Sequence, residues 1–327
     1  MPQIKCDPIL YFPIAKNVFE FKTGLRKLNT QSQARTEFIF QIDTQWPKYR
    51  AEKLNVRLEN FDKYVCETSL NPNLARNLSA FIVDQLTCCY SQFFALEKLG
   101  DNLLFSSSLS SERFLFNHYY ELLAVEYTNE EIIYSNLLDA LICQLQEDIS
   151  LSEFKNGQDS VSYLHLCFPN FWAAQDKIGK SFLSAHEPVP GMEKINSSSV
   201  NILKMLMNKG PFERFTWGVT SDTKLNHHPE GSQTIVDNKG RDWCDVAATA
   251  PLYLRIERQT TVPFTRHQAF LFTIRTYFRE IDELSREEQE CLAHSLRTMP
   301  AKVLNYKGLA NGGKELVLNR LKMPNLH

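Results

Sequence analysis

Two strand-like segments carry arginines at spacings that could bind an anionic group. They read "LRIERQTT" (254–261) and "FTIRTY" (272–277). Because alternate side chains of a strand share a face, Arg255 and Glu257 point to one side of the first segment, together with Gln259. Arg258 points to the other side, which is otherwise apolar. The first segment therefore offers an arginine to each face of the sheet.

The second segment repeats the pattern. Thr273, Arg275 and Tyr277 share one face, whereas Ile274 points to the other. An unpaired buried guanidinium is costly, so each arginine needs a partner. One interpretation is structural pairing with Glu257 or another carboxylate, which is the commoner outcome. The other is bidentate binding of an anionic ligand group. The residues alone leave both open.

A single histidine in "SAHEPVPG" (184–191) is the second candidate. Two prolines follow His186 closely, and each ring fixes its own φ while pushing the preceding residue out of the helical region. Most such histidines are satisfied by hydrogen bonds and do nothing else. However, imidazole is a common ligand of haem iron, and a ligand histidine must be held in one orientation. A proline-stiffened loop would help to hold it.

The remaining histidines are weaker candidates. His227 and His228 stand in a polar, turn-like segment that is expected to be solvated. His165 is expected in the core, His118 on a helix surface and His267 in a hairpin loop. No Ser/His/Asp set, H-E-x-x-H pattern, G-x-G-x-x-G motif or P-loop is present in the sequence.

Three helices are predicted around these segments. The first covers residues 74–99 and has mixed polarity. The second covers 128–149, where a T-x-x-E capping box precedes apolar residues at helical spacing. The third follows a capping box formed by Ser285 and Glu288 and is closed by a proline.

Between the helices, β-branched and aromatic residues predict strands. These strands are expected at 160–168, 214–220, 252–261 and 268–278. The loop between the last two has hairpin length, which favours antiparallel pairing. Strands gathered centrally with helices outside them indicate an α+β fold rather than a βαβ repeat.

Composition restricts the class of protein further. The 327 residues are 43% hydrophobic and 23% charged, with a net charge of −2, so a sizeable core is expected and no basic nucleic-acid footprint. The eight cysteines show no C-x-x-C spacing, which favours reduced thiols over a zinc site or a disulfide framework. No signal-peptide pattern or membrane-length apolar run is visible. We expect a cytoplasmic protein without nucleic-acid or membrane partners.

Several blocks, in order, resemble the haem-dependent oxidative N-demethylase-like family, formerly a domain of unknown function. The most telling is "LCFPNFWAAQDKIGKSFLSAHEPVPG" (166–191). The other blocks are "TGLRKL" (23–28), "FQIDTQWPKYRAEK" (40–53), "LQEDISL" (145–151), "RFTWGV" (214–219), "LRIERQTT" (254–261), "FLFTIRTY" (270–277) and "NYKGLA" (305–310). The resemblance spans nearly the whole chain, which is expected to form a single domain over residues 1–327.

The resemblance implies a PAS-like central antiparallel β-sheet flanked by α-helices, with haem b bound to it. It implies oxidative removal of a methyl group from a secondary or tertiary amine, with release of formaldehyde. That reaction needs dioxygen and two electrons, which an external flavin and iron–sulfur reductase partner usually delivers. A rival interpretation is a PAS-like haem or small-molecule sensor without enzymatic activity, because fold alone does not fix function.

The resemblance also implies roles for particular residues. His186 becomes the axial iron ligand, and three arginines become candidates for contacts to the haem propionates or the substrate: Arg255, Arg258 and Arg275. Glu257 would orient an arginine or meet a cationic amine as the catalytic carboxylate. The chain departs from the family pattern at Glu187, where a small apolar residue is expected, at 216–218, where it has T-W-G, and at 267–268 in the hairpin loop.

Overall fold

A long antiparallel hairpin forms the centre of the fold. Strands β9 (Phe212–Thr220), β10 (Tyr253–Phe264) and β11 (Ala269–Glu280) pair in the order β9-β10-β11. The computed structural model describes residues 3–15, 19, 24–126, 132–155, 157–187, 189–190, 199–229, 243 and 246–322. The predicted strands and hairpin are confirmed. The turn contains a 3-10 helix (Thr265–His267) and Gln268, which has a left-handed φ of 49°.

The hairpin belongs to a seven-stranded sheet in the order β1-β9-β10-β11-β7-β8-β2. Neighbouring strands in it are antiparallel. The other strands of this sheet are β1 (Arg26–Lys27), β2 (Val65–Glu67), β7 (Asp148–Lys155) and β8 (Gln158–His165). We call it the main sheet.

The helix predicted over 74–99 is wrong in its last third. Helix α2 (Pro72–Cys89) begins after Asn71, whose side chain accepts a hydrogen bond from the Asn73 amide. Strand β3 (Phe94–Leu99) follows. It opens a separate four-stranded antiparallel sheet with β4 (Asn102–Ser107), β5 (Glu112–Asn117) and β6 (Leu122–Glu126). This sheet was not predicted, because its strands are short and their apolar residues alternate only in part.

The helix predicted over 128–149 is also much shorter than expected. Helix α3 (Leu137–Ile142) begins after Asn136, whose side chain accepts from the Asp139 amide. The predicted capping box at Thr128 lies outside the described residues. Residues from Asp148 onward form strand β7 instead. Short apolar runs fit a buried helix and a buried strand equally well, and here tertiary pairing decided between them.

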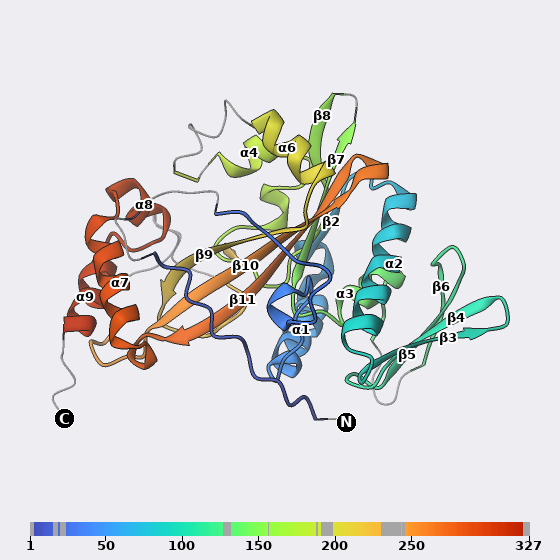
Figure 1. Cartoon of the computed structure of the whole chain (residues 1–327), viewed down its shortest axis with the longest axis horizontal. Helices are drawn as coiled ribbons and strands as arrows, with labels where there is room; N and C mark the ends of the chain where they lie inside the picture. The colour runs from blue at the N-terminus through green and yellow to red at the C-terminus, as the bar shows by residue number, and fades with distance from the viewer. Residues whose placement is uncertain are drawn as a thin grey trace.

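The third predicted helix is confirmed with its cap. In α7 (Arg286–Thr298), the Ser285 hydroxyl accepts from the Glu288 amide, and the Glu288 carboxylate accepts from the Ser285 amide. The other helices are α1 (Trp46–Tyr64), α4 (Phe182–His186), α6 (Ser199–Asn208), α8 (Ala301–Tyr306) and α9 (Gly313–Lys322). Figure 1 shows α4 and α6 at one end of β9–β11 and α7–α9 at the other.

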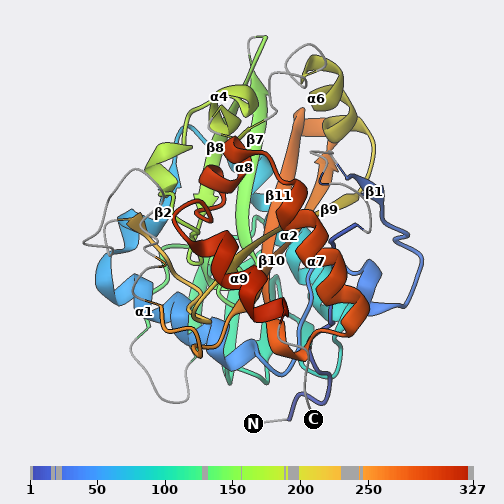
Figure 2. The same ribbon diagram turned by 90° about the vertical axis from the view of Figure 1, so that its left-hand side faces the viewer.

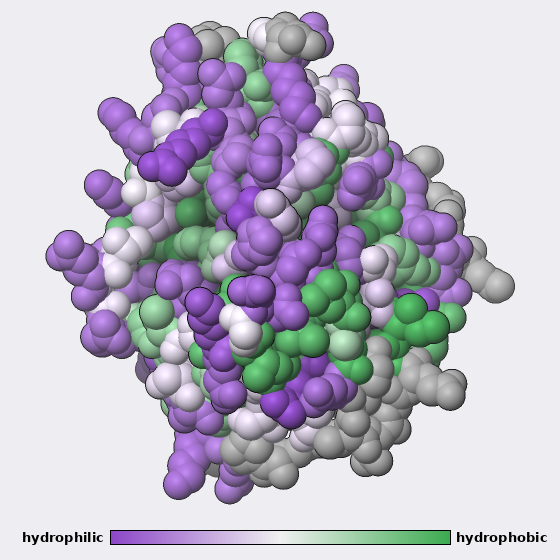
Figure 3. All heavy atoms as spheres, turned by 90° about the vertical axis from the view of Figure 1, so that its right-hand side faces the viewer, coloured by the Kyte–Doolittle hydropathy of each residue, from purple (hydrophilic) through white to green (hydrophobic). Residues whose placement is uncertain are grey.

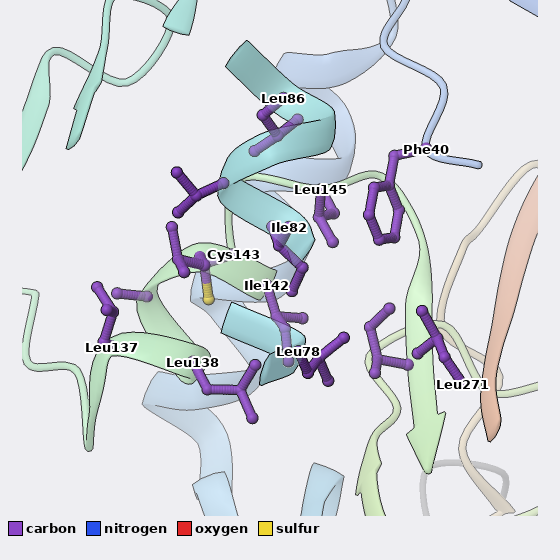
Figure 4. Packing of buried hydrophobic residues seen from close by; sticks show 14 of the residues in the cluster. Phe40, Leu78, Ile82, Leu86, Leu137, Leu138, Ile142, Cys143, Leu145 and Leu271 are labelled. Atoms are coloured by element: carbon purple, nitrogen blue, oxygen red, sulfur yellow. The ribbon is translucent and has the colours of Figure 1, made fainter. Parts of the chain in front are cut away.

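The largest hydrophobic cluster joins both sheets to helices α2 and α3. Figure 4 shows Leu78, Ile82 and Leu86 of α2 beside Ile142 of α3, with Leu271 of β11 close by. Phe94, Phe105, Phe114 and Phe116 of the four-stranded sheet belong to the same cluster. The fold is therefore α+β, with the two sheets sharing one core.

The four-stranded sheet lies at the end of the molecule opposite α8 and α9 (Figure 1). Figure 3 shows that end, where a hydrophobic area interrupts a mostly hydrophilic surface. The exposed leucines of this sheet are Leu96, Leu99 and Leu123. Across the described residues, we find no helix with both the length and the apolar character needed to span a membrane.

Candidate functional site

One face of β9–β10 gathers most of the candidate side chains, and we call it the site face. In β10, Glu257 lies opposite Thr216 of β9, and Gln259 lies opposite Arg214. Directly paired residues of an antiparallel sheet point to the same side, so these four side chains share one face. Arg255 also belongs to it, opposite Gly218 of β9.

Two of the predicted arginines point to the opposite face. Arg258 of β10 is paired with Arg275 of β11, and both are 1% exposed. Arg258 Nε donates to Glu213 Oε2 at 2.7 Å, and Arg275 Nη2 donates to Asp43 Oδ2 at 2.9 Å. The expectation that Arg258 stands among purely apolar neighbours is therefore wrong. Both guanidiniums are held in buried ion pairs on the side of the sheet away from the site face.

Arg255 is on the site face, but backbone carbonyls occupy its Nη donors, and its Nε is buried without a hydrogen-bond partner. Its two Nη atoms lie 3.0–3.1 Å from the carbonyl oxygens of Phe168, Lys224 and Leu225. The side chain is 1% exposed. Arg255 therefore ties the loop after β8 to the loop after β9, and both loops border the site face.

Glu257 is the carboxylate of the site face. Its Oε1 accepts from Asn170 Nδ2 at 3.4 Å, and its Oε2 accepts from Gln259 Nε2 at 3.1 Å. Arg255 Nε lies 4.0 Å from Oε1. The Glu257 side chain is 15% exposed, so a ligand on this face could reach it.

His186 is the last residue of α4, not part of an extended loop. The Ser181 hydroxyl caps this short helix by accepting from the Ser184 amide at 3.2 Å. Lys177 Nζ donates to the Ala185 carbonyl near the C-terminal end of the helix. Of the two prolines that were expected to stiffen the segment, Pro188 lies outside the described residues and Pro190 is in a turn. The observed support of His186 is thus a capped and tied helical turn.

Helix α4 packs onto the site face through Phe182. This ring belongs to a hydrophobic cluster with Phe212 of β9 and Phe272 of β11, which both lie opposite Thr261 of β10 on this face. The ring centroid of His186 is 4.4 Å from that of Phe182. Figure 2 shows α4 over the main sheet beside β8, and the Phe182 amide donates to Asp159 near the start of that strand. The fold therefore brings His186 to the same side as Glu257.

The tautomer of His186 is fixed by its own helix. His186 Nδ1 lies 2.7 Å from the Phe182 carbonyl oxygen, which can only accept, so Nδ1 carries the proton. Burial first, and then the nearby charges of Arg214 and Lys177, lower the pKa of His186 to about 4 despite that hydrogen bond. The imidazole is neutral at pH 7, and its Nε2 lone pair has no partner among the described residues. This is the state in which histidine binds a metal.

Arg214 is a site residue that the analysis of candidate arginines missed. Its Nε is buried without a hydrogen-bond partner, and its pKa is lowered because burial outweighs the nearby Glu257 and Tyr306. Tyr306, at the end of α8, has its pKa raised to about 12, mainly by burial. The signal was in the sequence, since Arg214 opens the "RFTWGV" block on a strand with buried neighbours.

Gly218 leaves room on the same face. A Cβ built on it would meet no heavy atom within 4 Å. A glycine inside a strand often marks a place where a ligand or another backbone approaches closely. The site face thus combines an open surface, a carboxylate, a cation without an ion pair and an oriented neutral imidazole.

A second cluster of ligand-type side chains is buried in the core. One possible ligand atom each of Asp139, Cys143 and His165 lies within 4.8 Å of the others. However, Arg57 Nη1 already pairs with Asp139 Oδ1 at 2.5 Å. Burial raises the pKa of Cys143 to about 11, so it stays a thiol. The cluster is therefore a buried polar network whose groups are satisfied within the protein. His165 is a core residue, as predicted.

The adjacent histidines are packed rather than solvated, which corrects the expectation for them. His228 is 5% exposed and its ring lies edge-on to Tyr64. His227 Nε2 lies 3.1 Å from Asp222 Oδ1, and its ring stacks on Phe171. His118 lies in an exposed turn after β5 rather than on a helix. His267 lies in the hairpin turn, as predicted.

Comparison with known protein families gives one match over most of the chain. The family model described as "Haem-dependent oxidative N-demethylase, alpha subunit-like" matches residues 30–317. The matched range contains every residue of the site face, α4 with His186, and Tyr306 of α8.

Proposed function

The chain belongs to the haem-dependent oxidative N-demethylase alpha subunit-like family, and from this membership we propose that it is a haem-dependent oxidative N-demethylase. Its substrate would be a secondary or tertiary methylamine, and one product formaldehyde. The observation that carries the proposal is His186: a neutral imidazole with Nδ1 hydrogen-bonded to a backbone carbonyl, on a helix that packs onto the site face.

The residues present fit haem b. A haem-ligating histidine usually donates its second ring nitrogen to a fixed acceptor, as His186 does to the Phe182 carbonyl. The open surface beside Gly218 and the aromatic side chains near α4 suit a large planar group. When bound, the haem would supply the activation of dioxygen, with electrons from an external flavin and iron–sulfur reductase.

The chain's own residues would then bind and orient. His186 would hold the iron through Nε2, while Lys177 and the Ser181 cap keep its helix in place. Glu257, held by Asn170 and Gln259, would attract a cationic amine to the site face. Arg255 would keep the two bordering loops closed against water.

Wider features of the proposal follow from the same family membership. We propose a PAS-like arrangement of the main sheet and a single domain over 1–327, which the core shared by the two sheets supports. A cytoplasmic location is supported by the described cysteines, which are free thiols. The rival proposal is a haem sensor without enzymatic activity. It would be supported if the protein binds haem but releases no formaldehyde when it is given dimethylamine and a reductant.

Haem titration of the purified protein tests the proposal. We expect a Soret band in the wild type, and a lost or shifted band in His186→Ala. His118→Ala is the matched control, because His118 is an exposed turn residue. A wild type without a Soret band, or a His186→Ala variant with an unchanged one, would contradict the ligand assignment.

A further inference from the structure

We propose that Arg214 binds a carboxylate of the molecule that occupies the site face, either a haem propionate or a carboxylate on the substrate. This inference rests on the proposed function and adds to it a residue that anchors the ligand. The family description names haem but no residue that binds it. Arg214 is also not among the strand arginines that the sequence singled out, which are Arg255, Arg258 and Arg275.

The first argument is that Arg214, a half-buried arginine of β9, has no hydrogen-bond partner among the residues that the structure describes. The buried arginines of the described residues each bond through at least one guanidinium nitrogen: Arg50 pairs with Glu112, Arg258 with Glu213, Arg275 with Asp43, and Arg255 with backbone carbonyls. The Nε atoms of Arg255 and Arg275 are also without a partner, but their Nη atoms have acceptors. Arg214 makes no hydrogen bond or ion pair with any residue that the structure describes, and its Nε is inaccessible to water. A buried N–H donor without an acceptor costs free energy, so a ligand group that pairs with this guanidinium would be bound favourably.

The second argument is that Glu257, the carboxylate whose charge acts on Arg214, makes no hydrogen bond with it. Glu257 is near enough for its charge to act on Arg214, but its oxygens accept from Asn170 and Gln259. The Tyr306 hydroxyl also lies close enough to affect Arg214, and with a pKa of about 12 it keeps its proton at pH 7. A guanidinium favours an oxygen anion as its partner.

The third argument is the charge around His186. Two cations lie on this side of the sheet: Arg214 on the site face, and Lys177 beside α4, the helix that ends at His186. Lys177 is tied to the Ala185 carbonyl, which leaves Arg214 as the cation of this pair without a partner. A ligand that reaches His186 and carries a carboxylate would compensate this charge, and a planar guanidinium binds a carboxylate through two parallel hydrogen bonds.

The experiment compares haem with haem dimethyl ester, in which the propionates are uncharged. Apo wild type, Arg214→Gln and Arg214→Lys are titrated with each, and Kd is read from the Soret band. If a propionate is the partner, Arg214→Gln should weaken haem binding by about 10- to 100-fold and leave ester binding unchanged. Arg214→Lys should fall between, because it keeps the charge and loses the fork.

The second arm uses haem-loaded protein, with N-methylglycine and dimethylamine read as shifts of the Soret band. If the substrate supplies the carboxylate, Arg214→Gln should weaken N-methylglycine binding alone and leave haem and ester binding unchanged. The matched control is Arg113→Gln, since Arg113 is a strand arginine paired with Glu126 on the exposed surface. Thermal unfolding of each variant verifies that it is folded.

Either pattern supports a carboxylate on Arg214 and identifies its source. An Arg214→Gln variant that binds haem, ester and N-methylglycine as the wild type does overturns this inference and leaves the proposed function standing. A wild type that binds no haem overturns the proposed function, and this inference with it.

Discussion

Burial strongly changes the pKa of one carboxylate beside the site face, that of Asp148. Asp148 of β7 accepts hydrogen bonds from the amides of Cys167 at 2.7 Å and Phe168 at 2.9 Å. Burial nevertheless dominates and raises the pKa of Asp148 to about 7, against the opposing charges of Lys53 and Arg255. Asp148 therefore supports the loop that carries Phe168 next to the site face, and it does so with a proton at acidic pH.

A pH dependence of stability follows. The native state keeps the Asp148 proton up to about pH 7, whereas the unfolded state loses it near the ordinary aspartate pKa of 3.8. The contribution of Asp148 to the free energy of unfolding is thus fully present below pH 3.8 and is lost as pH rises through about 7. Asp148→Asn removes this titration and keeps a side-chain oxygen as acceptor.

Urea unfolding of both proteins at pH 5, 6, 7 and 8 measures the difference. We expect Asp148→Asn to gain free energy of unfolding relative to the wild type as the pH rises from 5 to 8. Asp159→Asn is a control in which the mutated carboxylate belongs to the neighbouring strand β8. Parallel pH profiles for the wild type and Asp148→Asn would show that Asp148 does not titrate in this range.

At the scale of elements, strand β10 separates two kinds of arginine. Arg255 lies on the site face and ties loops together, whereas Arg258 faces the opposite side and pairs with Glu213. Arg275 of β11 lies beside Arg258 and packs its guanidinium 3.8 Å from the centre of the Tyr49 ring. One hairpin thus serves the fold on one face and the site on the other.

This division predicts that a substitution on the face away from the site lowers stability without changing haem binding. Arg275→Gln leaves Asp43 buried without its ion pair, which is expected to cost about 3–5 kcal/mol of the free energy of unfolding. The haem affinity of the folded protein should stay unchanged, because Arg275 is not on the site face. Urea unfolding and Soret titration of the same variant check both parts. Weakened haem binding at full stability would contradict this assignment of the two faces.

At the scale of the whole molecule, the two sheets are joined through α2 and α3. Leu78, Ile82 and Leu86 of α2 are 0% exposed and belong to the cluster that includes the phenylalanines of the four-stranded sheet. Because the sheets share these neighbours, disrupting α2 should disturb both together. Helices α8 and α9 lie at the end of the molecule opposite the four-stranded sheet (Figure 1).

Leu78→Ala tests this coupling. We expect a loss of about 2–5 kcal/mol in the free energy of unfolding, since the truncated side chain leaves a cavity in the core. Tryptophan fluorescence and far-UV circular dichroism should show one coincident transition in the wild type and in the variant. Leu58→Ala is the control, because Leu58 of α1 is 86% exposed. Separate transitions for the two probes would mean that the chain forms more than one folding unit.

The sequence by itself determined the local features whose signals lie within a few residues. Alternating β-branched and aromatic residues located β9, β10 and β11, and the S-x-x-E box located the start of α7. The order of family blocks identified the family that the chain belongs to. These signals survive because backbone geometry and capping act over short distances.

Only the tertiary structure decided which side chains meet. The alternation of side chains predicts on which face of its own strand each arginine lies. The register of β10 with β11 then puts Arg258 beside Arg275, on the face away from His186. The register of β10 with β9 brought Arg214 to the site face, where no sequence rule would reveal that it lacks a partner. Likewise, residues after Tyr90 became β3 because pairing with β4 satisfied their backbone groups. Partners distant along the chain settle these choices, so no local pattern encodes them.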